Sequence, residues 1–299
     1  MTAEVTPRRL EVPGGNLYYE VRGTGPLLLV IGQPMTSAPF GPMAELLAEH
    51  YTVVTYDPHG LGQSSVDDPS LQVTPEVQSD DLAQLVDSVG GGPAEVFATS
   101  GGAISGLAFA ASHPEKVRTL IAHEPPLTEL LPDAPYVRAV VDDIEETYRS
   151  AGPGAAWGKF VSLVMHTGPV PEAGVPPAAW PPSGLETPGD DGGQRPDADT
   201  GEPPAPSEKQ QADDELFFLR ILKPLTRYQP AVDTLRSGPP RVVVAVGETS
   251  RGELAQRSAV ALAERLGTSP VTLPGDHAGF MSDPAAYADR IRQVLGQTG

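Results

Sequence analysis

Ser100 stands at the junction between an apolar run, residues 95–98, and a stretch with helical spacing, residues 102–112. The residues around it read Ala-Thr-Ser-Gly-Gly, so positions 98 and 102 carry small side chains or none. A strand that turns sharply into a helix holds a serine hydroxyl at the tip of a strained turn, where it can attack a substrate. The pattern therefore favours a nucleophilic Ser100 over a glycine-rich helix start that serves packing alone.

His277 is the histidine best placed to serve such a nucleophile as a base. The sequence has six histidines, and the others are His50, His59, His113, His123 and His166. Only His277 follows a late apolar run, residues 271–273, in a loop that reads Gly-Asp-His-Ala-Gly. We expect it to take the Ser100 proton and return it to the leaving group. A loop histidine without a catalytic role is the alternative.

Short apolar runs alternate with helical patterns along the chain and must position these two residues. The runs expected to form strands are residues 27–31, 51–56, 95–98, 117–122, 241–246 and 271–273. Such runs are typical of parallel strands covered on both faces, so the alternation predicts an α/β doubly wound, mostly parallel sheet. An antiparallel hairpin is expected ahead of it, because residues 10–12 and 17–21 flank a Pro-Gly-Gly-Asn turn.

The alternation breaks between residues 127 and 235, where helical patterns and a Pro-, Gly- and Asp-rich stretch intervene. We predict a core domain of residues 1–126 and 236–299 and a helical cap of residues 127–235. Within the cap, residues 168–212 are expected to form a mobile insert, because so few apolar residues cannot offset the entropy of ordering. Ligands of open α/β sheets bind at the carboxyl edge, where this cap would lie.

The chain resembles the α/β-hydrolase family, and within it the capped esterase, epoxide hydrolase and haloalkane dehalogenase group. The resemblance rests on three loops besides the serine turn: residues 32–34 (GQP, with Ile31 in place of the usual His), residues 57–64 (DPHGLGQS) and residues 275–280 (GDHAGF). It implies a sheet of eight strands with the cap inserted after the sixth strand. It also implies a triad of Ser100, His277 and an acid.

The acid is where this sequence departs from the family. Ser250 occupies the position after the penultimate strand at which the family carries Asp. Some members instead have Glu directly after the strand that follows the nucleophile, and Glu124 stands there. We therefore expect Glu124 to be the acid, with Glu248 as the alternative. Strand alternation would turn the neighbouring His123 to the opposite side, as a structural or pocket-lining residue.

The resemblance also implies an oxyanion hole and a pocket. Gln33 and Gly101 are expected to offer their backbone N–H groups to the oxyanion. Met35, Phe40 and Trp157 are candidates for an apolar substrate pocket, and ordinary core packing is the alternative for all three.

Composition excludes several function classes. Lys and Arg number 20 against 39 Asp and Glu, which gives a formal net charge of −19 and makes nucleic acid and anionic membranes poor partners. The absence of Cys excludes disulfides, thiolate metal sites and a Cys nucleophile. Residues 1–20 contain no apolar segment of the kind that directs export, so we expect a cytoplasmic protein.

These observations together predict a serine hydrolase that cleaves a carboxylic ester or lactone of a small hydrophobic molecule. We expect it to need neither a cofactor nor a metal, and the sequence does not predict an oligomeric state. Amide or carbon–carbon bond hydrolysis, cofactor-free perhydrolysis and non-catalytic ligand binding are the alternatives. Dehalogenation and epoxide opening are disfavoured, because the relatives that perform them use an Asp nucleophile.

Overall fold

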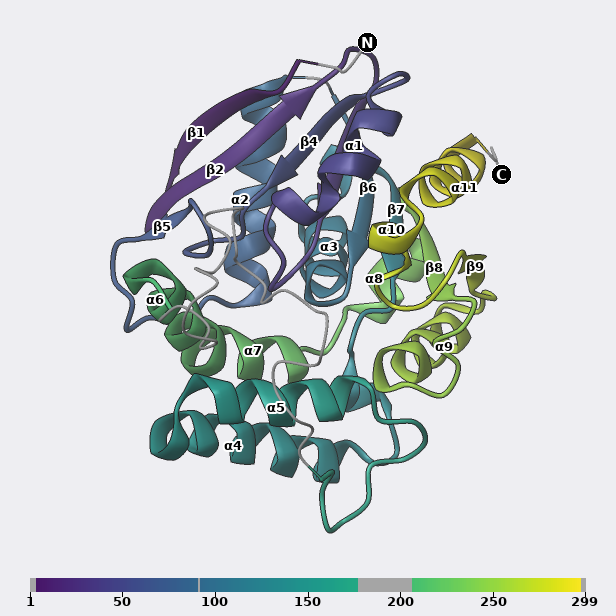
Figure 1. Cartoon of the computed structure of the whole chain (residues 1–299). Coiled ribbons are helices and arrows are strands. Elements are labelled where there is room, and N and C mark those ends of the chain that lie inside the picture. Colours follow the sequence, from purple (N-terminus) through teal and green to yellow (C-terminus); the bar gives the residue numbers. More distant parts are fainter. Residues whose placement is uncertain (1–3, 91, 177–205, 297–299) are drawn as a thin grey trace.

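The computed structural model describes residues 4–90, 92–176 and 206–296. In this part of the chain a single sheet has the strand order β1-β2-β4-β3-β6-β7-β8-β9, and a ninth strand, β5, pairs with β2 (Figure 1). The strands are β1 (Thr6–Val12), β2 (Gly15–Arg22), β3 (Leu27–Ile31), β4 (Thr52–Tyr56), β5 (Ser65–Val66), β6 (Ala94–Thr99), β7 (Val117–His123), β8 (Arg241–Gly247) and β9 (Val271–Leu273). The predicted α/β sheet of eight strands is confirmed, with the two-residue β5 as an addition.

The strand directions bring the candidate residues to one edge. β1 and β2 form the expected antiparallel hairpin, and β2 also runs antiparallel to β4. All later neighbours in the sheet, from β4 through β3, β6, β7 and β8 to β9, pair in parallel. The loops that follow these strands therefore lie side by side at the carboxyl edge.

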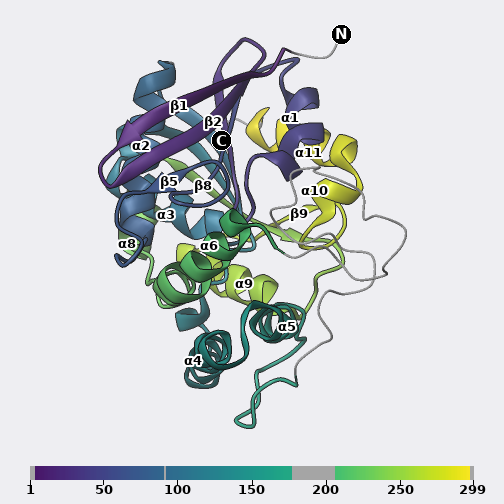
Figure 2. The same cartoon turned by 60° about the vertical axis from the view of Figure 1, so that its left-hand side comes forward.

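Helices cover both faces of the sheet, as Figure 2 shows with α1, α10 and α11 on one side and α2, α3 and α8 on the other. The helices outside the cap are η1 (Ala38–Phe40), α1 (Gly41–Leu47), α2 (Pro75–Val89), α3 (Gly101–Ser112), η2 (Pro114–Lys116), α8 (Val232–Ser237), α9 (Leu254–Leu266), α10 (Gly279–Ser282) and α11 (Pro284–Gly296). Alternate residues of each buried strand serve the two faces. In β3, Leu28 and Val30 pack with α1 and α11, whereas Leu29 and Ile31 pack with α2 and α3.

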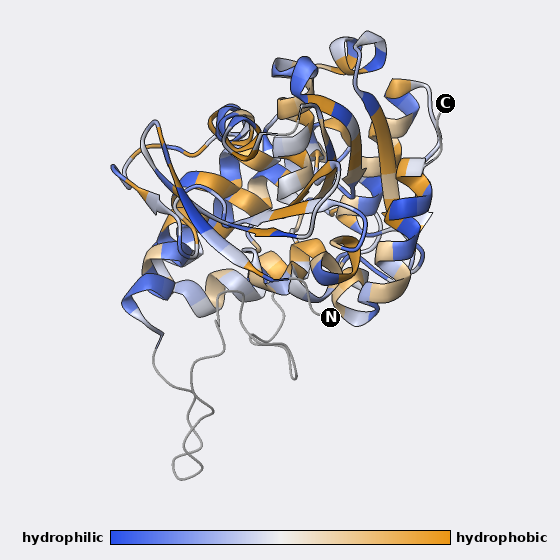
Figure 3. Cartoon of the chain, turned by 90° about the horizontal axis from the view of Figure 1, so that it is seen from above, coloured by the Kyte–Doolittle hydropathy of each residue, from blue (hydrophilic) through white to orange (hydrophobic). Residues whose placement is uncertain are grey.

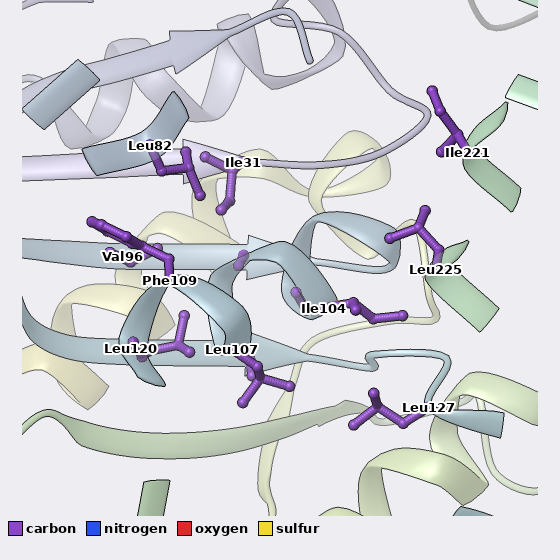
Figure 4. Close-up of a cluster of buried hydrophobic side chains, with 14 of the residues drawn as sticks. Ile31, Leu82, Val96, Ile104, Leu107, Phe109, Leu120, Leu127, Ile221 and Leu225 are labelled. Atoms are coloured by element: carbon purple, nitrogen blue, oxygen red, sulfur yellow. The ribbon is translucent and has the colours of Figure 1, made fainter. Parts of the chain in front are cut away.

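The cap follows β7, which is the sixth strand when the short β5 is left out, as predicted. Its helices are η3 (Thr128–Leu130), α4 (Ala134–Ala151), α5 (Pro153–Val164), α6 (Glu208–Leu216), η4 (Phe217–Ile221) and α7 (Leu222–Thr226). Figure 1 shows α4 and α5 beyond the carboxyl edge, with α7 between them and the sheet. Ile221 and Leu225 of the cap belong to the same hydrophobic cluster as Ile104 of α3 (Figure 4). The cap is thus joined to one face of the sheet by a continuous core.

Most of the predicted insert, residues 177–205, lies outside the described residues. On its N-terminal flank Val170 is buried, and its backbone N–H donates to Asp133 Oδ2 at 2.7 Å. On the other flank α6 begins at Glu208, inside the predicted insert, because the Ser207 hydroxyl caps it by accepting from the Gln210 N–H. This helix start corrects the predicted C-terminal limit of 212. The other predicted boundary, between residues 235 and 236, falls inside α8.

The hydrophobic colour in Figure 3 runs along the central strands, whereas most helices carry both colours, as expected for helices that cover a sheet. Among the described helices, none is both long and apolar enough to cross a bilayer.

Candidate active site

Four adjacent parallel strands each deliver one polar residue to the carboxyl edge. Ser100 follows β6, Glu124 follows β7, Ser250 lies shortly after β8, and His277 lies in the loop after β9. Neighbouring strands of a sheet lie about 4.8 Å apart, so residues that follow them directly can meet. These four residues come from positions up to 177 apart in the sequence (277 minus 100).

Ser100 occupies a backbone conformation that non-glycine residues rarely adopt. Its φ is 55° and its ψ is −131°, and its N–H donates to His123 O at 3.0 Å, which fixes the turn to the end of β7. The turn is tight because α3 starts at Gly101 and presses on the loop after β3. A Cβ on Gly102 would lie 2.7 Å from the Cα of Gly32, so only glycine fits at 102.

Glu124 accepts hydrogen bonds at both carboxylate oxygens. Oε2 lies 2.6 Å from Nδ1 of His277, and Oε1 accepts from the backbone N–H of Gly247 at 2.8 Å. The hydroxyl of Ser250 also donates to Oε1. Glu124 is fully buried, and Ser250 is fully buried beside it. The Ser250 side chain, at the position where the resemblance leads one to expect an acid, thus holds the acid that comes from the neighbouring strand.

These contacts set the ionisation of Glu124. Burial by itself raises the pKa of a carboxyl, but the hydrogen bond from His277, the nearby imidazoles and the Ser250 hydroxyl more than offset it and lower the pKa of Glu124 to about 2. Glu124 is therefore a carboxylate at neutral pH, and its Oε2 accepts a hydrogen bond from the Nδ1–H of His277. A neutral His277 then carries its proton on Nδ1 and leaves Nε2 free to accept one.

Backbone strain is concentrated at the same place. Within the described part of the chain, the non-glycine residues with positive φ are Ser100, at 55°, and Glu124, at 46°. Such conformations cost of order 1–3 kcal/mol each and persist where the surrounding structure enforces them. Two of them on adjacent strand ends, each at a polar residue, indicate a functional site.

Glu248, the alternative acid, is not brought to this cluster. Its side chain is exposed to solvent. Its backbone N–H donates to Leu273 O at 3.0 Å, which continues the pairing of β8 and β9, and no hydrogen bond or ion pair joins its carboxylate to His277.

His123 lies beside the cluster, and the sequence does not predict its contacts. Its ring stacks on that of His277, with centroids 5.8 Å apart. Its nitrogens form hydrogen bonds with Thr99 Oγ1 at 2.9 Å and with the Tyr287 hydroxyl at 3.2 Å. Complete burial lowers the pKa of His123 to about 3, so its imidazole is neutral beside the ionised Glu124. A histidine directly before the strand-end acid was the available signal, but Tyr287 is 164 residues away.

A cavity of about 50 Å³ opens over Ser100 and His277. Its walls are mostly apolar side chains of the cap and of α9, and its floor is the edge of the sheet. The lining residues are Gln33, Pro34, Ser100, Gly101, Pro126, Phe160, Leu163, Val164, Phe217, Leu222, Leu225, Thr226, Leu254, Ala255 and His277. No hydrogen bond joins Ser100 to His277 in this structure, and in ligand-free enzymes such bonds are often long and tighten when substrate binds.

The predicted oxyanion donors flank Ser100. Gly101 and Gln33 both line the cavity, and neither backbone N–H donates a hydrogen bond within the described residues. Gly101 begins the twelve-residue helix α3, whose N-terminal dipole favours negative charge nearby. The loop that carries Gln33 is held by Asp57, whose Oδ1 accepts from the N–H and the hydroxyl of Ser37 at 2.8 and 2.7 Å.

The three predicted pocket residues lie elsewhere. Phe40 stacks on Phe280 in the core between the sheet and α11, and this corrects its assignment, because the ring fills the space left by Gly32 rather than facing the cavity. Met35 packs against the same cluster. Trp157 stacks on Phe217 at 5.2 Å and lines a smaller neighbouring cavity, with its indole N–H donating to Asp214 at 2.9 Å.

A π-helical turn, η4, shapes the cap wall of the cavity. Pro224 has no N–H to donate to the Arg220 carbonyl four residues earlier, and that carbonyl instead accepts from the N–H of Val73 at 3.2 Å. The wider turn displaces the register of the helix between Phe217 and Leu222, which both line the cavity.

Among the residues that the structure describes, no group of three or more His, Asp or Glu side chains is arranged to hold a metal ion.

Comparison with known proteins identifies relatives over nearly the whole chain. Residues 25–194 match the family model described as the alpha/beta hydrolase fold. The chain is 30% identical over 294 residues to the uncharacterized hydrolase YraK of Bacillus subtilis, covering 96% of this chain and 94% of that protein.

Solved structures share the architecture. A thermophilic esterase from Thermogutta terrifontis superposes with a TM-score of 0.68 at 20% identity, covering 96% of this chain and 98% of its own. The carboxylesterase CesB from Bacillus subtilis gives a TM-score of 0.63 at 15% identity, covering 99% and 93%. At these identities the likeness shows a shared fold.

Proposed function

The chain belongs to the alpha/beta hydrolase fold family, and on that premise we propose that it is a serine hydrolase that cleaves a carboxylic ester or lactone through an acyl-enzyme. The observation that carries the proposal is the 2.6 Å hydrogen bond between His277 Nδ1 and the buried carboxylate of Glu124, at the edge where Ser100 is held with a φ of 55°. A nucleophile, a base and an orienting acid are the parts that acyl transfer requires.

Acylation follows from this arrangement. Ser100 Oγ attacks the carbonyl carbon while its proton passes to Nε2 of His277, and the ionised Glu124 stabilises the resulting imidazolium. The negative charge that develops on the carbonyl oxygen is stabilised by the N–H groups of Gln33 and Gly101. The imidazolium then gives its proton to the departing alkoxide, so an alcohol leaves and an acyl ester remains on Ser100.

Deacylation repeats these steps with water in place of the serine hydroxyl. His277 takes a proton from water, the hydroxide adds to the acyl carbonyl, and the proton returns to Ser100 Oγ as the acid leaves. The reaction balances with water as its co-reactant. For a lactone, the alcohol and the acid are parts of one product.

The cavity favours a small acyl group. One water needs about 10–15 Å³ of such space, so a cavity of about 50 Å³ accommodates a group of only a few heavy atoms. Its apolar walls favour a hydrophobic substituent. A further support for hydrolysis is the relative that shares 30% identity, which is named as a hydrolase.

A panel of esters, lactones and amides tests the proposal, with Ser100→Ala as the blank. We expect the wild-type protein to hydrolyse short-chain esters or lactones and Ser100→Ala to lose roughly 10⁴-fold or more of the rate. Equal rates for both proteins would contradict the proposal. If only amides are hydrolysed, the same residues would act in amide hydrolysis instead of ester hydrolysis.

A further inference from the structure

The side chain of Gln33 is buried without a partner in the wall of the cavity. It is 1% exposed, and neither its amide nitrogen nor its amide oxygen forms a hydrogen bond with any group in the described part of the chain. A carboxamide has two N–H donors and a carbonyl acceptor. Burying such a group without partners costs free energy, so a retained one calls for an explanation.

The surrounding walls do not supply partners. The side chains of the cap and of α9 that line the cavity are apolar except for Thr226, whose hydroxyl donates to Leu222 O at 2.9 Å. An apolar residue of similar size would fill the same space without the desolvation cost. The carboxamide is therefore better explained by an occupant of the cavity than by packing.

Gln33 is held close to the reacting atoms. A Cβ placed on Gly101 would lie 3.2 Å from the Cβ of Gln33 and 2.9 Å from its carbonyl oxygen, so the two residues are in direct contact beside Ser100. The backbone of the same residue is the proposed oxyanion donor. A group that meets the Gln33 side chain is consequently within a few bonds of the scissile carbonyl.

We propose that the Gln33 carboxamide determines specificity by binding a neutral hydroxyl or amide carried on the carbon next to the scissile carbonyl. This inference rests on the proposed function and narrows its substrates to esters or lactones of α-hydroxy or α-acylamino acids. Either group offers both a donor and an acceptor, which matches the two halves of the carboxamide. No Lys or Arg lines the cavity within the described residues, so a carboxylate at that position would lack a counter-charge.

Three phenyl esters with one carbon skeleton test the proposal: the propionyl ester, the racemic lactyl ester with an added hydroxyl, and the racemic N-formylalanyl ester with an added amide. Each kcat/KM is divided by the rate of hydroxide-catalysed hydrolysis of the same ester, which removes the intrinsic effect of the substituent. We expect at least one substituted ester to exceed the propionyl ester at least tenfold. In Gln33→Met this ratio should fall about tenfold or more, toward 1.

The ratio of the substituted ester to the propionyl ester is unaffected by any change in the oxyanion hole that alters the rates of all three esters alike. The matched control is Gln78→Met, the same change at a buried carboxamide of α2 that does not line the cavity, and the ratio should stay as in the wild-type protein. The wild-type ratio tests the inference even where a variant fails to fold.

Each result has a distinct meaning. Hydrolysis of all three esters with equal normalised rates overturns this inference and leaves the proposed function standing. The same holds if Gln33→Met keeps the wild-type ratio. Hydrolysis of none of these esters, nor of any in the wider panel, overturns the proposed function and this inference with it.

Discussion

In the proposed triad the acid, Glu124, follows β7, whereas Ser250 occupies the position after β8 at which the family resemblance places an acid. The ends of β7 and β8 are neighbours, and the Ser250 hydroxyl and the Gly247 N–H both donate to the Glu124 carboxylate. A carboxylate in this position needs such donors, because it is fully buried. Ser250 therefore holds the acid in the orientation in which its other oxygen meets His277.

Replacing Glu124 by Gln tests this assignment at the level of one atom. The amide cannot stabilise the His277 imidazolium with a negative charge and presents the wrong partner to Nδ1, so we expect kcat to fall about 10⁴-fold. Steady-state hydrolysis of the best ester in the panel measures it. Glu248→Gln removes the same charge from an exposed neighbour and should keep at least half of the wild-type rate. The reverse ranking of the two variants would refute the role of Glu124.

His123 makes a separate prediction about stability and pH. Its pKa is lowered to about 3 in the folded protein from the ordinary value of 6.5, so between these values the unfolded chain binds a proton that the folded protein does not. Stability therefore falls as the pH is lowered through this window, by at most about 1.4 kcal/mol per pH unit from this residue. The groups that face it are Glu124, His277 and Tyr287.

Urea unfolding of the wild-type protein and His123→Gln from pH 6.5 to 4 measures the effect. Gln does not titrate and can still form hydrogen bonds, so the curve of the variant should be flatter. Parallel curves for the two proteins would show that His123 is not held neutral.

At the scale of elements, the turn between β6 and α3 requires glycine at position 102. The first turn of α3 crosses the loop after β3 so closely that Gly102 and Gly32 are in backbone contact. This approach places the proposed oxyanion donors, Gly101 and Gln33, beside the Ser100 hydroxyl. Spacing between strand, turn and helix is therefore part of the chemistry and not only of the fold.

Gly102→Ala should disturb this turn. The new Cβ would lie 2.7 Å from Gly32 Cα, and a backbone atom cannot yield as a flexible side chain does, so we expect a loss of about 1–3 kcal/mol of stability together with activity. Gly154→Ala is the matched control, since it lies in α5 with nothing within 4 Å of its new Cβ. Thermal unfolding should show this control unchanged or stabilised by up to about 1 kcal/mol. A Gly102→Ala protein as stable as wild type would contradict the close packing.

Local sequence patterns predict much of the fold and of the candidate site, and what they fail to predict has a physical reason. The alternation of apolar runs and helical spacing predicts the sheet, because strand periodicity and helix periodicity are local properties. Ser100 and His277 could be proposed from the turns that hold them. Glu124 could be proposed because the resemblance places an acid at position 250, where this chain has Ser. For Phe40 the sequence leaves pocket and core open, because apolarity near a motif does not determine which face of the sheet a ring reaches, and the structure places it in the core. The contact between His123 and Tyr287 joins residues 164 positions apart and has no local signature.

At the scale of the whole molecule, the cap shares one hydrophobic cluster with one face of the sheet (Figure 4). Side chains of the cap and of the carboxyl edge of the sheet line the cavity. The cavity therefore has the size that the packing of α5, η4 and α7 against the sheet allows. Acyl chains too long for this cavity require the cap to yield, which costs contacts in that core.

Acyl chain length should reveal this limit. Across phenyl esters from acetyl to octanoyl, we expect kcat/KM to be highest among the two- to four-carbon acids and at least tenfold lower for octanoyl. Leu163→Ala removes three carbons from a buried cavity wall and should shift the optimum toward longer chains, at a stability cost of about 2–5 kcal/mol. Leu71→Ala, the same change at a side chain 61% exposed, should leave the profile as it is. An unchanged profile in Leu163→Ala would mean that the acyl group binds elsewhere.

Covalent trapping with a fluorophosphonate examines the poised hydroxyl most directly. Intact-mass spectrometry should show one phosphonyl group on the wild-type protein, and peptide mapping should locate it on Ser100. His277→Ala should label at least a hundredfold more slowly, because the base is gone. A folded wild-type protein that stays unmodified, or that is modified at another residue, would contradict the account.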